Sequence, residues 1–263
     1  MNYFIFKQFS RIIHESFGIH YGIKKKIVLK NRIDKRIKEL GLESYSTYLE
    51  LLNDNKSELQ KLADKITTNT TYFFREPEHF EFLRRKVFTQ IMKEKWSTIR
   101  IWSAPCSTGQ ELYSIAIEAA LFKEKNKGFN FKVYGSDLSE SALSTARRGI
   151  YILDDISKIK MKVRNSFFEQ VEEQFKVGYK IRENTVFYKL NLLEDDLSTQ
   201  TKFDVIFCRN MLMYFKKSEQ EIIINKLCER LVTGGYFIIS RNESIFGLNT
   251  PLKSVEHSVF IKE

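Results

Sequence analysis

The stretch IRIWSAPCSTGQELYSI, residues 99–115, changes character in its middle. Its first six residues are mostly apolar and predict a buried strand. Small and turn-forming residues follow from Pro105 to Gly109, and a helical pattern begins near Glu111. A strand, a tight turn and a helix leave free backbone N–H groups at the helix start, where a nucleotide or a carboxylate can bind. Because Gly109 alone does not complete a dinucleotide-binding fingerprint, a plain β–α connection is the alternative.

Strand and helix patterns alternate from residue 98 to the end of the chain. This alternation predicts an α/β fold with a doubly wound, mostly parallel sheet and right-handed crossovers. We expect strands at 99–104, 131–137, 185–190, 203–208, 235–240 and 257–262, and helices at 110–123, 139–148 and 217–231.

Residues 151–184 interrupt this alternation. Aromatic residues stand among many charges there, and the segment KVGYKI at 176–181 suggests a short strand around a glycine. We therefore expect a small β-rich insertion after the second α/β unit.

The first 66 residues show helical periodicity and no clear strand. Ile33, Ile37 and Leu40 share one helix face, and Lys24, Lys35 and Lys38 lie opposite. This predicts a small all-helical N-terminal domain over 1–66, then a linker loop and helix over 67–95, then the main domain over 96–263.

The net charge of +10 is concentrated locally, since eight Lys or Arg and one acid lie between Lys24 and Lys38. Such a cluster is either a solvated face or a surface for RNA, a membrane or an acidic protein. Three widely spaced cysteines without a C-x-x-C pair indicate a reducing compartment and argue against a zinc cluster. No apolar run reaches the length of a membrane span, and no cleavable leader is recognisable. We expect a cytoplasmic protein without membrane insertion.

Polar residues stand at the ends of two expected strands. Asp137 ends the second strand, where an acid commonly accepts hydrogen bonds from ribose hydroxyls, although it could instead cap the helix that starts near Ser139. Arg209, Asn210 and Tyr214 follow the strand in FDVIFCRNMLMYF, 203–215, and belong beside the ligand crevice. The alternative for that segment is a polar turn followed by a packing stripe.

The segment TTNTTYFFRE, 67–76, suits neither a helix nor a regular strand. A loop that lies over a ligand with its hydroxyls turned inward is one interpretation. The other is a linker whose aromatic side chains fill a domain interface.

Five segments, in order and at fitting spacings, resemble the chemotaxis-receptor glutamate methyltransferases, the CheR family. They are TNTTYFFRE, WSAPCSTGQELYS, YGSDLSESALSTARRGIY, LNLLE and FDVIFCRNMLMYF, and they span roughly residues 65–240. The sequence departs from the family pattern at Pro105, at Leu112 and at Ser240–Arg241–Asn242, which replace the first three residues of G-H-S-E-S.

The resemblance implies methyl esterification of receptor glutamates with S-adenosylmethionine, yielding S-adenosylhomocysteine, without a metal and in the service of sensory adaptation. Carried over position by position, it assigns residues to each part of the cofactor. Asn69, Thr71 and Arg75 would close over the cofactor, and Ala104 and Glu111 would lie along its methionine and amino end. Asp137 would hold the ribose, and Asn191 and Leu192 would meet the adenine. Arg209 and Asn210 would line the site, and Tyr214 would lie near the transferring methyl with Arg75.

A glutamate side chain is already ionised at neutral pH, so its carboxylate can attack without a general base. His79, the histidine within these motifs, is accordingly expected at the surface or at an interface. The basic residues Lys24, Arg32, Lys35 and Lys38 would attract the glutamate-bearing helices of the cytoplasmic domain of a receptor.

We expect a monomer that has no nucleic-acid partner. The alternatives are a methyltransferase that acts on RNA or a small molecule, and a non-catalytic scaffold that binds S-adenosylmethionine.

Overall fold

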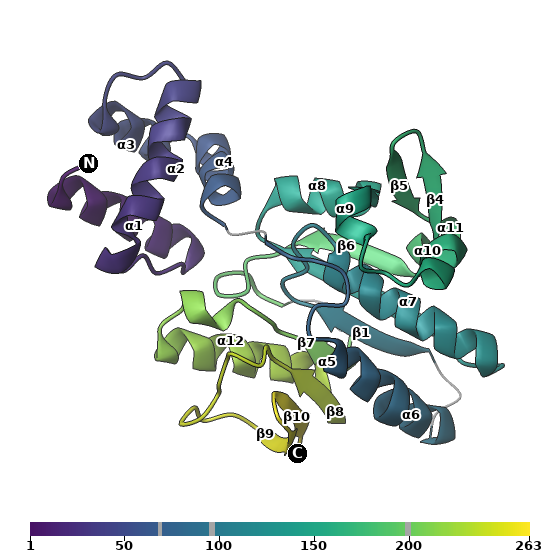
Figure 1. Cartoon of the computed structure of the whole chain (residues 1–263). Coiled ribbons are helices and arrows are strands. Elements are labelled where there is room, and N and C mark those ends of the chain that lie inside the picture. The colour runs from purple at the N-terminus through teal and green to yellow at the C-terminus, as the bar shows by residue number, and fades with distance from the viewer. Residues whose placement is uncertain (68–69, 95–97, 198–200) are drawn as a thin grey trace.

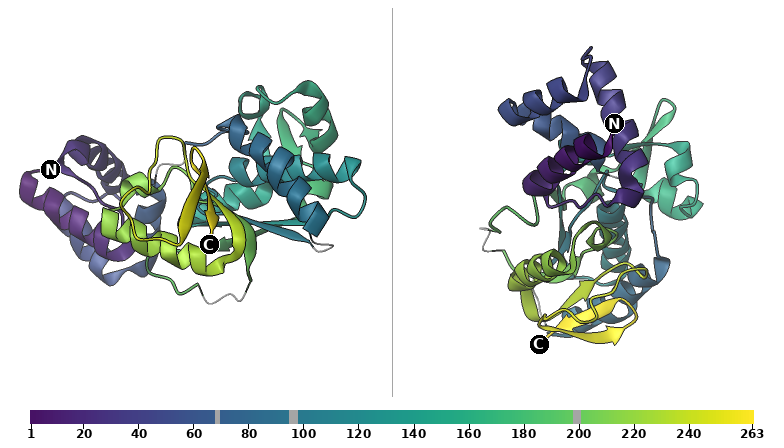
Figure 2. Two further views of the ribbon diagram at one scale, coloured as in Figure 1. Left: turned by 90° about the horizontal axis from the view of Figure 1, so that it is seen from below. Right: turned by 90° about the vertical axis from the view of Figure 1, so that its left-hand side faces the viewer.

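A computed structural model describes residues 1–67, 70–94, 98–197 and 201–263. Helices from the first quarter of the chain stand beside a larger α/β part (Figure 1). The left-hand view of Figure 2 places the N-terminal helices and the small antiparallel sheet of the insertion at opposite ends of the molecule.

The N-terminal helices pack around a core of their own, in which Phe9, Ile13, Leu29 and Tyr48 are fully buried. Side-chain oxygens of Asn2, Ser44 and Asn55 cap three of the helices at their N-termini. The elements are α1 (Tyr3–Phe17), the short 3₁₀ helix η1 (Ile23–Lys25), α2 (Lys26–Glu39), α3 (Tyr45–Asp54) and α4 (Lys56–Ile66). The expectation of an all-helical N-terminal region is confirmed.

A further helical segment connects this region to the sheet. It begins as α5 (Pro77–Phe82), passes through the π-helical turn η2 (Leu83–Val87) and continues as α6 (Phe88–Glu94).

The main sheet has seven strands in the order β6-β2-β1-β7-β8-β10-β9. Neighbours from β6 to β8 pair in parallel, and β10 pairs antiparallel with both β8 and β9. The strands are β1 (Ile99–Ser103), β2 (Phe131–Asp137), β6 (Thr185–Lys189), β7 (Phe203–Phe207), β8 (Leu231–Ile238), β9 (Leu252–Glu256) and β10 (Val259–Lys262). The predicted doubly wound, mostly parallel sheet is confirmed, although β8 begins earlier than expected and β9 was not predicted.

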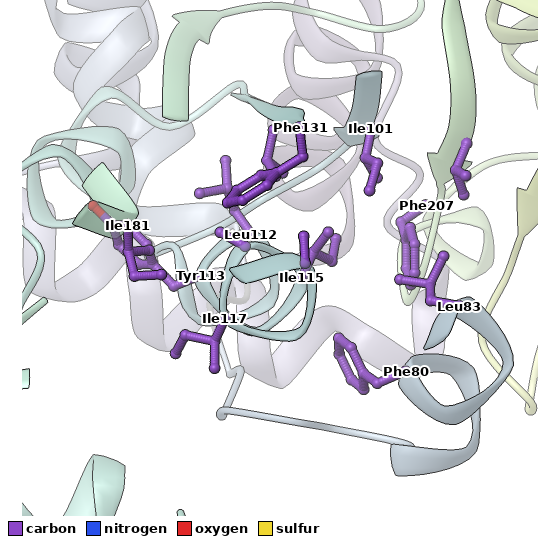
Figure 3. Close-up of a cluster of buried hydrophobic side chains, with 14 of the residues drawn as sticks. Phe80, Leu83, Ile101, Leu112, Tyr113, Ile115, Ile117, Phe131, Ile181 and Phe207 are labelled. Carbon is purple, nitrogen blue, oxygen red and sulfur yellow. The ribbon is translucent and has the colours of Figure 1, made fainter. Parts of the chain in front are cut away.

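Helices cover both faces of this sheet. On one face α7 (Gln110–Lys125) packs with α5 and with α8 (Glu140–Arg148), and on the other α12 (Lys217–Arg230) buries Ile223 and Leu227. Figure 3 shows how Ile115 of α7, Ile101 of β1 and Phe80 of α5 meet in the first of these layers. Residues from separate stretches of sequence thus fix the carboxyl ends of β1, β2 and β7 relative to one another.

The insertion carries a three-stranded antiparallel sheet in the order β3-β5-β4 together with short helices. The prediction of a strand over 176–181 is wrong beyond Val177. The strand ends at Val177, because the carbonyl of Gly178 accepts hydrogen bonds from the N–H groups of Ile181 and Arg182 and so starts a helical turn. The elements are β3 (Ile150–Ile152), α9 (Leu153–Ile156), α10 (Met161–Phe167), β4 (Phe168–Val171), β5 (Gln174–Val177) and α11 (Tyr179–Arg182).

Across the four described ranges, the helices are too short or too polar for any of them to cross a membrane.

Candidate functional site

The turn between β1 and α7 is tightly fitted. Gly109 caps α7 with φ at 98°, and a Cβ there would lie 2.9 Å from Ala146 Cβ and 2.9 Å from Tyr151 Oη. Only glycine suits such a position, because it combines a left-handed backbone with close neighbours. The turn directs the Ser107 N–H at the end of β2, where it donates to Asp137 Oδ2 at 2.8 Å.

The carboxylate of Asp137 is almost completely buried and points into a cavity. Its Oδ1 accepts a second backbone hydrogen bond, from the Ser139 N–H at 2.9 Å. Burial raises the pKa of Asp137 even though these N–H groups favour its charged form. The residue that caps α8 is Ser139, which accepts from the Ala142 N–H at 3.1 Å. The interpretation of Asp137 as merely the helix cap is therefore wrong.

The cavity at Asp137 has a volume of about 120 Å³ and mostly apolar walls. Phe17 and Ile66 come from the N-terminal helices and Ile19 from the loop after α1, whereas Leu192 and Met211 come from loops at the sheet. Apolar walls around one buried acid suit a flat nucleoside whose ribose hydroxyls reach the carboxylate.

Asn191 and Leu192 both line this cavity, but the Asn191 side chain has structural tasks as well. Its Oδ1 accepts from the Leu193 N–H at 3.1 Å, and its Nδ2 donates to the Ser16 carbonyl of α1 at 3.3 Å. Asn191 therefore shapes its loop and holds α1 against the cavity.

A second cavity of about 210 Å³ adjoins the first, and Pro105, Ser107, Asn210 and Tyr214 line both. The walls of the second cavity carry charged side chains of both signs and include Thr71, Arg75, Glu111 and Arg209. Two cavities that share a boundary fit a ligand with a nucleoside at one end and a charged amino acid at the other.

Arg209 organises the floor of the second cavity, because its side chain is only 1% exposed and joins several elements. Its guanidinium donates to Glu111 Oε2 at 2.8 Å and to the Arg75 carbonyl at 2.6 Å, and it lies 3.0 Å from Glu76 Oε2. Burial raises the pKa of Glu111, and the charge of Arg209 opposes that shift. The predicted site residue Arg209 thus lines the cavity mainly as a fixed support.

The loop before α5 both packs and faces the site. The Phe73 ring lies 5.0 Å from the Tyr151 ring, and the Phe74 N–H donates to Ser114 Oγ at 2.9 Å. Thr71 and Arg75 line the second cavity from this anchored loop. In the described part of this loop Phe73 is buried, whereas Tyr72 is 47% exposed and lines the second cavity with Thr71 and Arg75. Both interpretations of residues 67–76 stay predictions.

Arg75 and Tyr214 face the second cavity from different sides. The Arg75 Nη1 donates to the Thr70 carbonyl at 3.2 Å. Tyr214 ends the 3₁₀ turn η3 (Leu212–Tyr214), and its carbonyl accepts from the His20 N–H at 2.8 Å. The Lys25 ammonium lies 4.6 Å from the centre of the Tyr214 ring, so the N-terminal helices contribute directly to the surroundings of Tyr214.

Of the predicted cofactor residues that the structure describes, Ala104 does not line either cavity. Ala104 is fully buried and donates its backbone N–H to the Phe207 carbonyl at 2.8 Å, one residue before Pro105 enters the cavity wall. Asn69 lies outside the described residues.

The basic residues of the N-terminal helices differ in what they offer to a partner. Lys24, Lys35 and Lys38 are exposed. The Arg32 guanidinium instead donates to the Tyr21 hydroxyl at 2.9 Å and also to the Ile66 carbonyl. Arg32 therefore joins α2 to the end of α4, a task that the sequence did not indicate.

Of the two places expected for His79, the surface is wrong, because its side chain is only 2% exposed. Its Nε2 pairs with Ser258 Oγ at 2.7 Å, and its Nδ1 lies 3.4 Å from Glu76 Oε2. Burial and the charge of Arg209 lower the pKa of His79 to about 4, so it is neutral at physiological pH.

Sequence reasoning also missed Glu76, Ser240 and Glu243, which hold the loop after β7. Glu243 accepts from the backbone N–H groups of Asn210 and Leu212 at 2.9 and 2.8 Å. The signal available was an acid beside a family motif, in RE at 75–76 and in NES at 242–244.

The comparison with known families covers nearly the whole chain. The model described as "CheR methyltransferase, SAM binding domain" matches residues 69–261, and the one described as "CheR methyltransferase, all-alpha domain" matches residues 5–67.

Individual relatives match over similar lengths. A chemotaxis protein methyltransferase of Borreliella burgdorferi is 35% identical over 245 residues, which is 90% of this chain and 87% of the relative. The chemotaxis protein methyltransferase of Salmonella typhimurium is 32% identical, over 92% of this chain and 84% of its own. That of Escherichia coli is 31% identical, over 91% and 84% respectively.

Proposed function

The chain belongs to the CheR methyltransferase family, and from this premise we propose that it uses S-adenosylmethionine to esterify glutamate side chains of chemotaxis receptors. Methylation in chemotaxis follows from the family, since relatives that match most of the chain are named chemotaxis protein methyltransferases. The choice of glutamate carboxylates as acceptors is the proposed part.

One observation supports the proposal above the others. Two cavities meet at Asn210 and Tyr214, with the buried acid Asp137 on one side of the junction and the cation Arg75 on the other. Asp137 suits ribose hydroxyls, and Arg75 suits a carboxylate that enters the second cavity.

The bound cofactor supplies a methyl group on a positively charged sulfur, which is an activated leaving group. Arg75 holds one oxygen of the substrate carboxylate by a charge-assisted hydrogen bond and leaves the other oxygen to attack. Tyr214 limits the space beside the attacking oxygen. Fixing the two reactants in line contributes roughly 7–11 kcal/mol in well-oriented systems. Because attack by an anion on a cation removes both charges, walls that exclude water favour the reaction.

The proposed reaction requires no general base, because the acceptor carboxylate is already ionised. In the described parts of the chain, neither cavity is lined by a histidine. Glu111, the acid of the second cavity, is engaged by Ser103 and Arg209.

The proposal is tested by incubating the protein with receptor-containing membranes and methyl-labelled S-adenosylmethionine. A glutamate ester releases its label as methanol in mild alkali, whereas methylated RNA or a methylated amine does not. Arg75→Ala is expected to lower kcat/KM by roughly 10- to 100-fold, the effect of losing one hydrogen bond to a charged group. Arg85→Ala is the matched control, since Arg85 is exposed and pairs only with Glu81 in the described contacts. Alkali-stable label, or equal activity of Arg75→Ala and wild type, would contradict the proposal.

A further inference from the structure

The segment after β8 departs from the family pattern, and its first residue is built into the site. Ser240 is fully buried. Its hydroxyl donates to Glu76 Oε1 at 2.7 Å and accepts from Asn210 Nδ2 at 2.8 Å. Ser240 thus links the residue that follows Arg75 to the residue at the junction of the two cavities. Glycine, which stands at this position in the G-H-S-E-S pattern, has no side chain to make either contact.

The direction of these hydrogen bonds follows from which of the three side chains, Glu76, Ser240 and Asn210, carry a proton to donate. Glu76 lies beside Arg209 at 3.0 Å and accepts from the Arg241 N–H at 3.2 Å. Although burial opposes ionisation, the Ser240 hydroxyl and the Arg209 charge hold the pKa of Glu76 below its usual range. An ionised carboxylate only accepts hydrogen bonds, so the single Ser240 proton points to Glu76.

This direction determines the orientation of the Asn210 amide. Since Ser240 Oγ has given its proton to Glu76, it can only accept from Asn210, and the NH₂ group of Asn210 must face it. The amide oxygen of Asn210 is then turned away from Ser240. Among the described residues, none donates a hydrogen bond to that oxygen.

The backbone of Asn210 is held as firmly as its side chain. Asn210 has φ at 59°, a left-handed conformation that asparagine tolerates, and its N–H donates to Glu243 Oε2 at 2.9 Å. The Ser240 N–H donates to the same Glu243 oxygen at 3.1 Å. Asn210 therefore presents a fixed acceptor at the boundary of the two cavities.

We infer that Ser240 is a positioning residue, which orients the Asn210 amide so that its oxygen accepts a hydrogen bond from the α-ammonium group of S-adenosylmethionine. An ammonium group only donates, so it requires acceptors. Glu111 is the carboxylate that lines the second cavity, and its two oxygens already accept from Ser103 and Arg209. The inference rests on the proposed function for its cofactor and is independent of the methyl acceptor.

The test compares two ligands by calorimetry. S-adenosylhomocysteine carries the ammonium group, and methylthioadenosine has the same nucleoside without the amino-acid end. Ser240→Ala is expected to weaken binding of S-adenosylhomocysteine about 5- to 10-fold, the effect of one hydrogen bond, and to change binding of methylthioadenosine less than about twofold. Ser244→Ala is the matched control, because the Ser244 hydroxyl accepts only from the Phe246 N–H in the described contacts.

A double-mutant cycle separates positioning from a general loosening of the site. In an Asn210→Ala background, Ser240→Ala should cause no further loss of S-adenosylhomocysteine affinity, because there is no amide left to orient. Equal weakening of both ligands, or independent effects of the two substitutions, would overturn the inference.

A second variant, Ser240→Cys, keeps the inference testable if Ser240→Ala folds poorly. Ser240→Cys is nearly isosteric but has a weaker donor, and its effect on S-adenosylhomocysteine should lie between wild type and Ser240→Ala. An equal loss for both ligands with Ser240→Cys would also overturn the inference. These binding measurements need no receptor, so a receptor assay that shows no glutamate ester contradicts the proposed function without affecting them.

Discussion

At the scale of single residues, Asp137 is a buried carboxylate in the wall of a cavity. Its carboxylate is 6% exposed and accepts two backbone hydrogen bonds from the turns that it joins. Burial that raises the pKa of Asp137 is a cost to the folded protein at neutral pH, when the carboxyl is ionised. Such costs are common at binding sites.

Asp137→Asn is expected to weaken S-adenosylhomocysteine and methylthioadenosine equally, by roughly 10-fold or more, since a charged acceptor for the nucleoside is lost. Calorimetry with both ligands measures this. The pattern contrasts with Ser240→Ala, which should affect only the ligand with the amino-acid end. Selective loss of S-adenosylhomocysteine in Asp137→Asn would mean that Asp137 does not contact the nucleoside.

His79 provides a pH-dependent term in stability. Its folded pKa of about 4 lies below the ordinary value of 6.5. Between these values the unfolded chain binds a proton at His79 that the folded protein does not, so stability is fully present above about pH 6.5 and falls as the pH decreases toward 4. The total loss is on the order of 3 kcal/mol.

His79→Gln should flatten that part of the pH dependence, because glutamine does not titrate. Urea unfolding at several pH values between 4 and 7 compares the free energy of unfolding of the variant with that of wild type. His257→Gln replaces an exposed histidine next to Ser258 and should keep the wild-type slope. A variant at His79 with an unchanged slope would show that this histidine is not the source.

At the scale of elements, the basic residues of α2 fall into two groups: some bond within the helical domain, and others are exposed to solvent. Arg36 of α2 forms a two-pronged ion pair with Glu58, whose side chain is 4% exposed, and Arg32 bonds to the end of α4. Lys35 and Lys38 on the same helix are exposed. The basic cluster therefore stabilises the helical domain on one side and presents cations on the other.

We propose that the exposed side attracts the acidic helices of a receptor. Combined Lys35→Glu and Lys38→Glu should raise the KM for receptor several-fold and leave S-adenosylhomocysteine affinity unchanged. Combined Lys7→Glu and Arg11→Glu on α1 makes the same change in net charge and is the control. Equal effects of the two double variants would indicate only a general electrostatic attraction, and an unchanged KM would exclude the proposed surface.

At the scale of the whole molecule, residues of the N-terminal helical region and of loops at the sheet together line the cavity at Asp137. Gly18, at the end of α1, packs tightly against the loops at the sheet: a Cβ there would lie 2.4 Å from Leu193 Cδ2 and 3.0 Å from Phe215 Cε1. Gly18 is followed by Ile19, which lines the cavity. The seating of the helices and the shape of the cavity are therefore coupled.

Gly18→Ala should displace α1 from the loop at Leu193 and weaken nucleoside binding at least several-fold. Gly41→Ala is the matched control, since Gly41 has nearly the same φ, 66° against 69°, with no atom within 4 Å of its added Cβ in the described structure. Both variants should lose roughly 1 kcal/mol of stability from left-handed alanine. Calorimetry with methylthioadenosine distinguishes them, and equal binding by both would mean that the contact at Gly18 does not shape the cavity.

Much of the fold could be predicted from local patterns in the sequence. The sequence placed β1, β2, β6 and β7 to within a residue. For β7 the reason is that a strand buried along its whole length is a continuous apolar segment. β9 was missed because its burial is slight and its pattern weak. The turn of α11 was read as a strand because four residues are too few to show a helical period.

The sequence by itself also determined the family, and the matches to both CheR models confirm that resemblance. The sequence also identified Asp137, Arg75, Glu111 and Tyr214 as site candidates, because polar residues at strand ends and in family motifs can be recognised without a structure. Only the tertiary structure decided that His79 is buried, that Arg32 faces inward and that Ser240 connects Glu76 with Asn210. Those facts depend on contacts between residues up to 179 positions apart, as between His79 and Ser258, and no local pattern encodes such distances.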